Sequence, residues 1–153
     1  MTATNHAITA ANMALITKQW WILPLAFLSH FALDALPHYG DPTPEARAPK
    51  YKTVLSVDLI VLALFAWLVI MTAGQFVWLV IIVGFIAWSP DMVWFYRDYR
   101  ERRDKTLPPQ NWLTNFHAHI QKYERGWGWI LEVVWFVAML FAYTSLVIAA
   151  RQS

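Results

Sequence analysis

Three long apolar stretches restrict the possible folds of this chain more than any other feature. They cover residues 51–74, 75–96 and 126–150. A bilayer core about 30 Å thick requires about 20 apolar residues of helix, and each stretch is long enough. Across the chain 58% of residues are hydrophobic and 14% are charged, whereas soluble proteins carry about 25% charged residues. The sequence therefore predicts an all-α integral membrane helical bundle.

The N-terminal region is shorter and less apolar than these stretches. Residues 6–18 and 20–37 are separated by the polar pair Lys18-Gln19, and Trp20 follows as a residue typical of membrane interfaces. One kinked helix and a tight hairpin both fit this pattern, and we favour a hairpin of the two segments. No basic residue precedes the first apolar run, so we expect this end of the chain to be retained and not cleaved as a signal peptide.

An amphipathic segment lies between the second and third stretches. In residues 111–125, apolar residues recur at helical spacing with polar residues between them, which predicts a helix on the membrane surface or against the bundle. Within the second stretch, the Ser-Pro-Asp run at 89–91 predicts a break and a helix restart with Ser89 as N-cap. We expect one domain over residues 1–153, with four to five membrane-embedded helices and one cytoplasmic amphipathic helix.

Basic residues indicate which side of the membrane each connection faces. The connections at 38–52 and 97–110 are basic, whereas the turn at 72–75 carries no charge. The positive-inside rule places basic connections in the cytoplasm. We therefore predict a protein of a bacterial-type inner or plasma membrane, with both basic loops cytoplasmic. No basic stripe with interleaved aromatic residues indicates nucleic-acid binding.

Four carboxylates lie at similar distances from the cytoplasmic ends of their segments. Each is six or seven residues from a basic or loop residue, which corresponds to about 9–10 Å along a helix. They are Asp34, Asp58, Asp91 and Glu132. Ionisable groups inside a membrane cost about 2.5–3.5 kcal/mol each, so they normally face partners or a water-filled cavity. We expect a shared polar site that contains a positive charge, supplied by protonated histidine, an arginine or a metal ion.

Histidines supply candidate metal ligands in the same region. His30, Asp34 and His38 are spaced four residues apart, on one face of a helix. This stripe spans about 12 Å, so one ion cannot easily bind all three side chains. Either Pro37 turns His38 back toward Asp34, or one of the three serves a second ion. Imidazole and carboxylate suit Zn, Mn, Fe or Ni, and the absence of cysteine excludes thiolate sites.

Arginines and two further histidines indicate where a substrate headgroup would bind. Arg97, Arg100 and Arg103 follow the second stretch and would attract a phosphate. His117 and His119 lie about 200° apart on a helix, so only one of them would face the site. Taken singly, each residue is also explained as a topology signal or an interfacial side chain. Packing explains poorly why so many acids and histidines share one level of one small bundle.

The runs NHAITA, LSHFALDALPH and SPD together resemble a family of small integral-membrane proteins described as membrane-bound metal-dependent hydrolases. That family has a His opening the first helix, a His and an Asp at the end of a later helix, and a Pro-Asp at a helix end. Its Pro-Asp-x-Asp-His run is represented here only by SPDMVW. The resemblance implies metal ligands at His6, His30, Asp34, His38 and Asp91.

These observations and the resemblance predict a metal-dependent hydrolase at the cytoplasmic leaflet, with membrane lipid and a divalent metal as partners. The metal, Zn first and Mn or Fe otherwise, would activate a water that attacks an amphiphilic lipid ester or phosphoester. Asp58 or Asp91 would act as general base. An ion or proton transporter, or a membrane scaffold that uses the same cluster, is the alternative. Haem held by His6 with His30 or His38 ranks last, because the spans have few glycines to accommodate a porphyrin.

Overall fold

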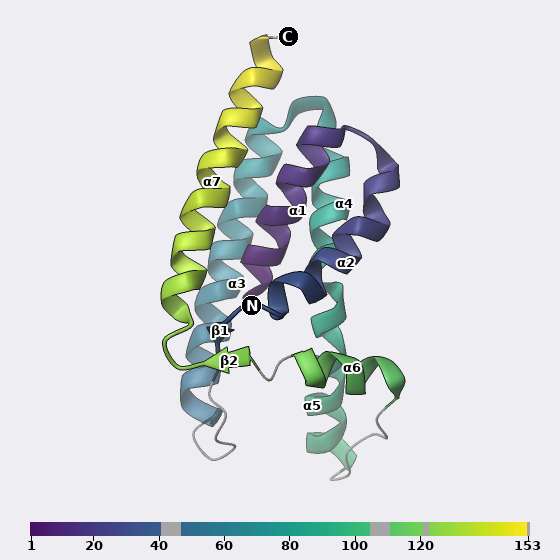
Figure 1. Cartoon of the computed structure of the whole chain (residues 1–153), viewed down its shortest axis with the longest axis vertical. Helices are drawn as coiled ribbons and strands as arrows, with labels where there is room; N and C mark the ends of the chain where they lie inside the picture. The colour runs from purple at the N-terminus through teal and green to yellow at the C-terminus, as the bar shows by residue number, and fades with distance from the viewer. Residues whose placement is uncertain (41–46, 105–110, 121–122, 153) are drawn as a thin grey trace.

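The computed structural model describes residues 1–40, 47–104, 111–120 and 123–152, which form an all-α fold (Figure 1). The helices are α1 (Ala3–Thr17), α2 (Leu23–Asp34), α3 (Arg47–Thr72), α4 (Val77–Trp88), α5 (Met92–Asp104), α6 (Trp112–Ile120) and α7 (Trp129–Gln152). Short 3-10 turns occupy Trp20–Ile22, Gly74–Phe76 and Ser89–Asp91, and strand β1 (His38–Tyr39) pairs in parallel with β2 (Glu124–Arg125).

Three helical segments in the described ranges are long and apolar enough to cross a membrane. They are Lys52–Thr72, Gly74–Trp94 and Trp129–Ala150, close to the three apolar stretches of the sequence. Only 17% of the most apolar window of the first segment and 11% of that of the third are buried inside the protein. Their outward faces are therefore apolar and exposed, which is consistent with a membrane protein.

Helix α1 lies at the centre of the bundle, between α4 and α7 (Figure 1). It has 15 residues, and Ile8, Ala10 and Ala14 are fully buried. Ala7 faces Gly84 of α4, where a Cβ atom would lie 3.6 Å from the carbonyl oxygen of Ala7. Small residues at this crossing let the two backbones approach closely. Hydropathy alone would not predict that this helix is central, because it carries small and polar residues in place of large apolar ones.

Two asparagines join α1 to α7. Asn5 donates from Nδ2 to the carbonyl of Glu132 (3.2 Å), and Asn12 donates from Nδ2 to the carbonyl of Met139 (2.9 Å). The two asparagines are seven residues apart, so they lie on one face of α1. Buried side-chain hydrogen bonds of this kind fix the register of two helices, because a shifted register would leave the polar groups unpaired. The first turn of α1 is thereby held at one level of the bundle.

Two expected boundaries differ in the structure. The arginine-rich segment expected as a loop from residue 97 continues as α5 to Asp104, because Arg and Glu are good helix formers and Arg100 pairs with Asp104 one turn later. The amphipathic helix expected over 111–125 ends at Ile120, and Glu124–Arg125 forms β2 instead. Periodicity does not reveal the pairing of Glu124–Arg125 with the distant strand β1.

Helix α2 also ends before the residue expected. It stops at Asp34, shortly before Pro37, and His38 lies in β1. The residue before a proline is biased away from the helical region, which favours an end at this point. His38 therefore does not share a helix face with His30 and Asp34.

Strand β1 follows α2 and strand β2 precedes α7, so their pairing holds the end of α2 close to the start of α7. The backbone N–H of Tyr39 donates to Oε1 of Glu132 (3.0 Å), so a side chain of α7 also holds the strand. Gly128 packs directly on β1, where a Cβ atom would lie 2.1 Å from the carbonyl carbon of His38 and 2.6 Å from the backbone nitrogen of Tyr39. Such distances are far below van der Waals contact, so this position requires glycine.

We expect Gly128→Ala to destabilise the protein by about 1–3 kcal/mol, because the added methyl group must displace the backbone of β1. Gly126→Ala is the matched control, since a Cβ atom at Gly126 would meet nothing within 4 Å. Thermal unfolding of both variants in detergent measures the difference. Equal unfolding temperatures for the two variants would contradict the close packing of Gly128 on β1.

Candidate metal centre

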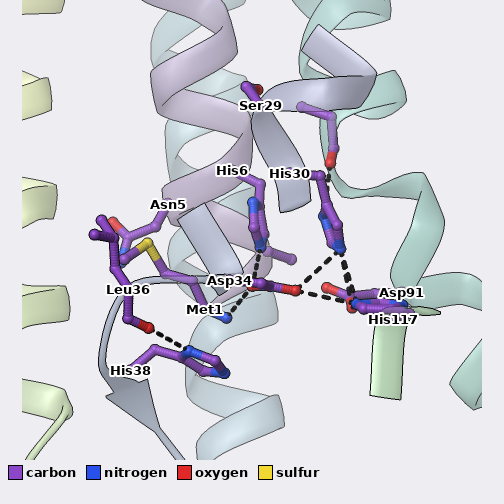
Figure 2. A network of polar contacts seen from close by, with 12 residues as sticks. Met1, Asn5, His6, Ser29, His30, Asp34, Leu36, His38, Asp91 and His117 are labelled. Atoms are coloured by element: carbon purple, nitrogen blue, oxygen red, sulfur yellow. Dashed lines mark hydrogen bonds and ion pairs between the residues drawn. The ribbon is translucent and has the colours of Figure 1, made fainter. Parts of the chain in front are cut away.

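Four side chains from three parts of the chain converge at the end of the bundle where α1 begins (Figure 2). His30 and Asp34 lie one turn apart on α2, Asp91 ends the 3-10 turn after α4, and His117 belongs to α6. One ligand atom of each lies within 4.8 Å of the others. Within the described ranges, this is the group of His and acidic residues that could hold a metal ion.

Three of the four ligand atoms form an equilateral triangle. Nε2 of His30, Nε2 of His117 and Oδ2 of Asp34 are each 3.1 Å from the other two. Oδ1 of Asp91 lies farther away, 3.6 Å from Nε2 of His30 and 3.5 Å from Nε2 of His117. The three side chains of the triangle are at most 1% exposed, whereas that of Asp91 is 21% exposed. Asp91 therefore forms the accessible side of the cluster.

The hydrogen bonding of His30 shows that the centre of the cluster needs a positive charge. Nδ1 of His30 lies 2.9 Å from the carbonyl oxygen of Ala87, and a carbonyl only accepts, so Nδ1 carries the proton. In the neutral ring Nε2 is then a lone pair, and it faces the carboxylates of Asp34 and Asp91. Acceptors this close repel one another unless a proton or a metal ion lies between them.

The helix break at Pro90 accounts for the placement of His30 and Asp91. Proline has no N–H, so the carbonyl of Ile86 loses its usual donor four residues later. The Ser89 hydroxyl donates to that carbonyl instead (2.9 Å), so Ser89 does not act as the N-cap that the sequence predicted. In the last turn of α4, just before the break, the carbonyl of Ala87 accepts the Nδ1–H of His30. The break thus orients one ligand and presents Asp91 to the cluster.

The donor set fits a divalent metal ion. A tetrahedral ion with metal–ligand distances of about 2.0–2.1 Å holds its ligand atoms about 3.3 Å apart. The three atoms of the triangle are 3.1 Å apart, and Oδ1 of Asp91 lies 3.5 and 3.6 Å from the two histidine nitrogens. Ligand histidines normally donate their second ring nitrogen to a carbonyl or a carboxylate, as His30 does to Ala87. Geometry and the surrounding hydrogen bonds therefore both match a metal centre with nitrogen and oxygen ligands.

The second carboxylate oxygen of Asp34 faces α1 and not the cluster. Nε2 of His6 lies 3.1 Å from Oδ1 of Asp34, and the amino group of Met1 forms an ion pair with the same oxygen. The His6 ring also stacks on that of His30, with centroids 4.1 Å apart and planes 25° apart. His6, expected as a ligand, is therefore adjacent to the cluster but not one of the four converging side chains.

His38, also expected as a ligand, lies near the cluster but outside it (Figure 2). Its Nδ1–H donates to the carbonyl of Leu36 (2.8 Å), which leaves Nε2 as a lone pair. The residue is 3% exposed. Burial lowers the pKa of His38 below the usual value of histidine, because desolvation penalises the charged ring.

Asp58, expected as a general base, caps the central helix. Its Oδ2 accepts the backbone N–H of Ala3 (2.8 Å) and its Oδ1 accepts that of Thr4 (3.2 Å). Both carboxylate oxygens are thus used at the N-terminus of α1, where unpaired N–H groups and the helix dipole favour an anion. The structure places Asp58 as a support for α1 and not beside the four converging side chains.

Glu132 has a similar supporting position. Its side chain accepts the N–H of Tyr39 in β1, and its backbone carbonyl accepts the side chain of Asn5 in α1. Asp34, Asp58 and Glu132 therefore all contact the first two turns of α1 or the strand beside it. The carboxylates at similar depth surround one helix end, but only Asp34 and Asp91 contribute to the possible metal site.

The residues expected to bind a headgroup lie in different places. His117 belongs to the cluster, whereas the side chain of His119, two residues later, is exposed. Arg100, which is partly buried, and Arg103, which is exposed, both lie on α5 and pair with Asp104. The side chain of Arg97 lies outside the described residues.

His117 is the ligand position that the sequence did not assign to the metal. The spacing of the two histidines showed that only one of them could face a site, but α6 lies far from α2 in the sequence. Its docking depends on ring contacts of Phe31 with Phe116 (5.3 Å) and with His117 (5.5 Å). No periodic pattern reveals such a contact between distant segments.

Comparison with protein-family models, with curated proteins and with solved structures finds no match. A functional assignment therefore rests on the chemistry of His30, Asp34, Asp91 and His117.

Proposed function

We propose that this protein is a metal-dependent hydrolase of the membrane, with His30, Asp34 and His117 as metal ligands. The observation that carries the proposal is the buried triangle of two imidazole nitrogens and one carboxylate oxygen, 3.1 Å apart. Three protein ligands with one open position are typical of catalytic zinc sites, whereas structural sites are closed by four. We therefore infer zinc as the resident metal, with manganese or iron as alternatives. A hydrolase also agrees with the family that the sequence resembles.

Asp91 is the group best placed to act as general base. Its carboxylate lies on the accessible side of the cluster, farther from the two histidines than Asp34 is. When bound, the metal would lower the pKa of a water toward about 7 and polarise an ester carbonyl or phosphoryl group. A water bound on this side would lie within reach of Asp91, whose carboxylate would accept its proton. His30 and Asp34, held by α2, keep the site rigid.

The position of the site suggests an amphiphilic substrate. His117 of the cluster belongs to α6 and Asp91 directly precedes α5, and these two helices lie at one end of the fold (Figure 1). Tyr96, Tyr99 and Trp112 near this end are 53%, 57% and 78% exposed, and Tyr and Trp are enriched at membrane interfaces. We infer that the site lies at headgroup depth, in a bacterial-type inner or plasma membrane with the arginine-rich end cytoplasmic. The substrate would then be a lipid ester or phosphoester.

The test compares Asp91→Asn with Asp58→Asn in detergent micelles, using chromogenic acyl esters and phosphate esters of several chain lengths. We expect Asp91→Asn to keep its metal and to lose about 10²–10⁴-fold in turnover, the usual contribution of a general base. Asp58→Asn should keep its metal and lose at most about a few-fold in turnover, because asparagine retains one acceptor oxygen for the N-terminus of α1. A metal-loaded wild type that hydrolyses none of the esters would contradict the hydrolase proposal and favour transport or a scaffold role.

A further inference from the structure

We propose that His6 is a positioning residue that fixes two metal ligands at once and is not itself a ligand. The proposal rests on the metal centre proposed above and concerns the contacts behind it. His6 is fully buried and touches both ligands of α2, Asp34 through a hydrogen bond and His30 through its ring. Each contact constrains a different degree of freedom of the site.

The first contact sets the orientation of the Asp34 carboxylate. A carboxylate oxygen only accepts, so Nε2 of His6 donates its proton to Oδ1 of Asp34 at 3.1 Å. Nδ1 of His6 is then the lone pair, and it has no hydrogen-bond partner among the described residues. With Oδ1 held by α1, the other oxygen, Oδ2, points at His30 and His117. The carboxylate cannot rotate away without breaking the bond to His6 and the ion pair of the same oxygen with the Met1 amino group.

The second contact sets the plane of the His30 ring. The rings of His6 and His30 stack with centroids 4.1 Å apart. The His30 ring is also held at one edge, where Nδ1 donates a hydrogen bond to the carbonyl of Ala87. Because the His30 ring is fixed both by stacking on its face and by the hydrogen bond of Nδ1, its other nitrogen, Nε2, can point only toward the centre of the cluster. The two contacts together prepare the site before a metal arrives.

Helix α1 can perform this task because its first turn is itself held. Asp58 accepts the N–H groups of Ala3 and Thr4, and Asn5 bonds to the carbonyl of Glu132. His6 follows these residues directly, so its backbone is fixed by α3 and α7 while its side chain reaches α2. The central, buried helix α1 therefore supports the metal ligands of α2 from the side opposite the metal centre.

Three variants separate the two contacts. His6→Gln keeps an N–H donor but no ring, His6→Phe keeps a stacking ring but no donor, and His6→Leu removes both. Zinc affinity is measured by competition with a chromogenic chelator, on full-length protein in detergent, and the absorption spectrum of the Co²⁺-loaded protein reports the ligand set. His30→Ala serves as the reference for loss of a ligand.

We expect all three variants to bind as many metal ions as wild type. His6→Leu should bind zinc about 10–100-fold more weakly, the usual effect of removing a group that orients a ligand, and the other two should show smaller losses. The Co²⁺ bands should keep their positions. Failure of His6→Gln and His6→Phe to bind metal at saturation, a shift of the Co²⁺ bands, or unchanged affinity in all three variants would each overturn the proposal. A wild type that binds no metal would contradict the metal centre itself, which separates the two failures.

Discussion

His117→Ala is expected to abolish metal binding, while His119→Ala leaves it intact. His117 supplies one corner of the ligand triangle and is 1% exposed, whereas the side chain of His119 is exposed and lies outside the cluster. Loss of one corner leaves two ligands on α2 and an incomplete coordination shell. Metal content of the two purified variants, measured by plasma mass spectrometry, gives the comparison directly.

The pair is well matched, because both substitutions remove one imidazole from the same short helix. His30→Ala and Asp34→Ala extend the comparison to α2 and should also lose the metal. Retention of metal in His117→Ala together with its loss in His119→Ala would contradict the placement of α6. Equal retention in both would mean that α6 does not contribute to the site.

Removal of the metal is expected to release α6 from the bundle. Among its described side chains only Thr114 and His117 are buried, and the hydroxyl of Thr114 is used at the start of α6 itself, where Thr114 and Asn111 cap each other. His117 is therefore the main polar anchor of the helix. Without the ion, the His117 ring faces the carboxylates of Asp34 and Asp91 and the lone pair on Nε2 of His30. The attraction that docks α6 on the bundle is then lost.

Hydrogen–deuterium exchange with and without a strong chelator measures this release. Amides of α6 should exchange markedly faster in the metal-free protein, because locally opened segments lose protection. Amides around Val80 and Val83 of α4 provide the internal control, since both residues belong to the hydrophobic core and neither is among the four converging side chains. Identical exchange of α6 in both states would show that the helix docks independently of the metal.

The three helices that are long and apolar enough to cross a membrane could be predicted because their signal is local. A long run of apolar residues predicts a membrane-spanning helix whatever surrounds it. The Ser-Pro-Asp run predicts a break because proline lacks an N–H wherever it occurs. The structure accordingly has its break at Ser89–Asp91. Sequence reasoning assigned Ser89 the wrong hydrogen bond, because the competing acceptor, the carbonyl of Ile86, becomes available only through the break itself.

The central position of α1 could not be predicted, because it depends on partners. Its alanines contribute little to hydropathy, yet the small side chain of Ala7 permits close contact with Gly84. Similarly, the common depth of Asp34, Asp58, Asp91 and Glu132 led us to expect one shared site, but it did not indicate the different contacts that these carboxylates make. Whether a carboxylate caps a helix, holds a strand or faces a metal depends on which backbone lies beside it.

The central claim is that two imidazole nitrogens and at least one carboxylate oxygen hold a metal ion in this protein. X-ray absorption at the zinc edge of the purified, zinc-loaded wild type tests it most directly. We predict a first shell of nitrogen and oxygen atoms at about 2.0–2.1 Å, with the outer-shell signal of two imidazole rings and no sulfur. An oxygen-only shell without imidazole scattering, or a protein that retains no zinc, would contradict the account.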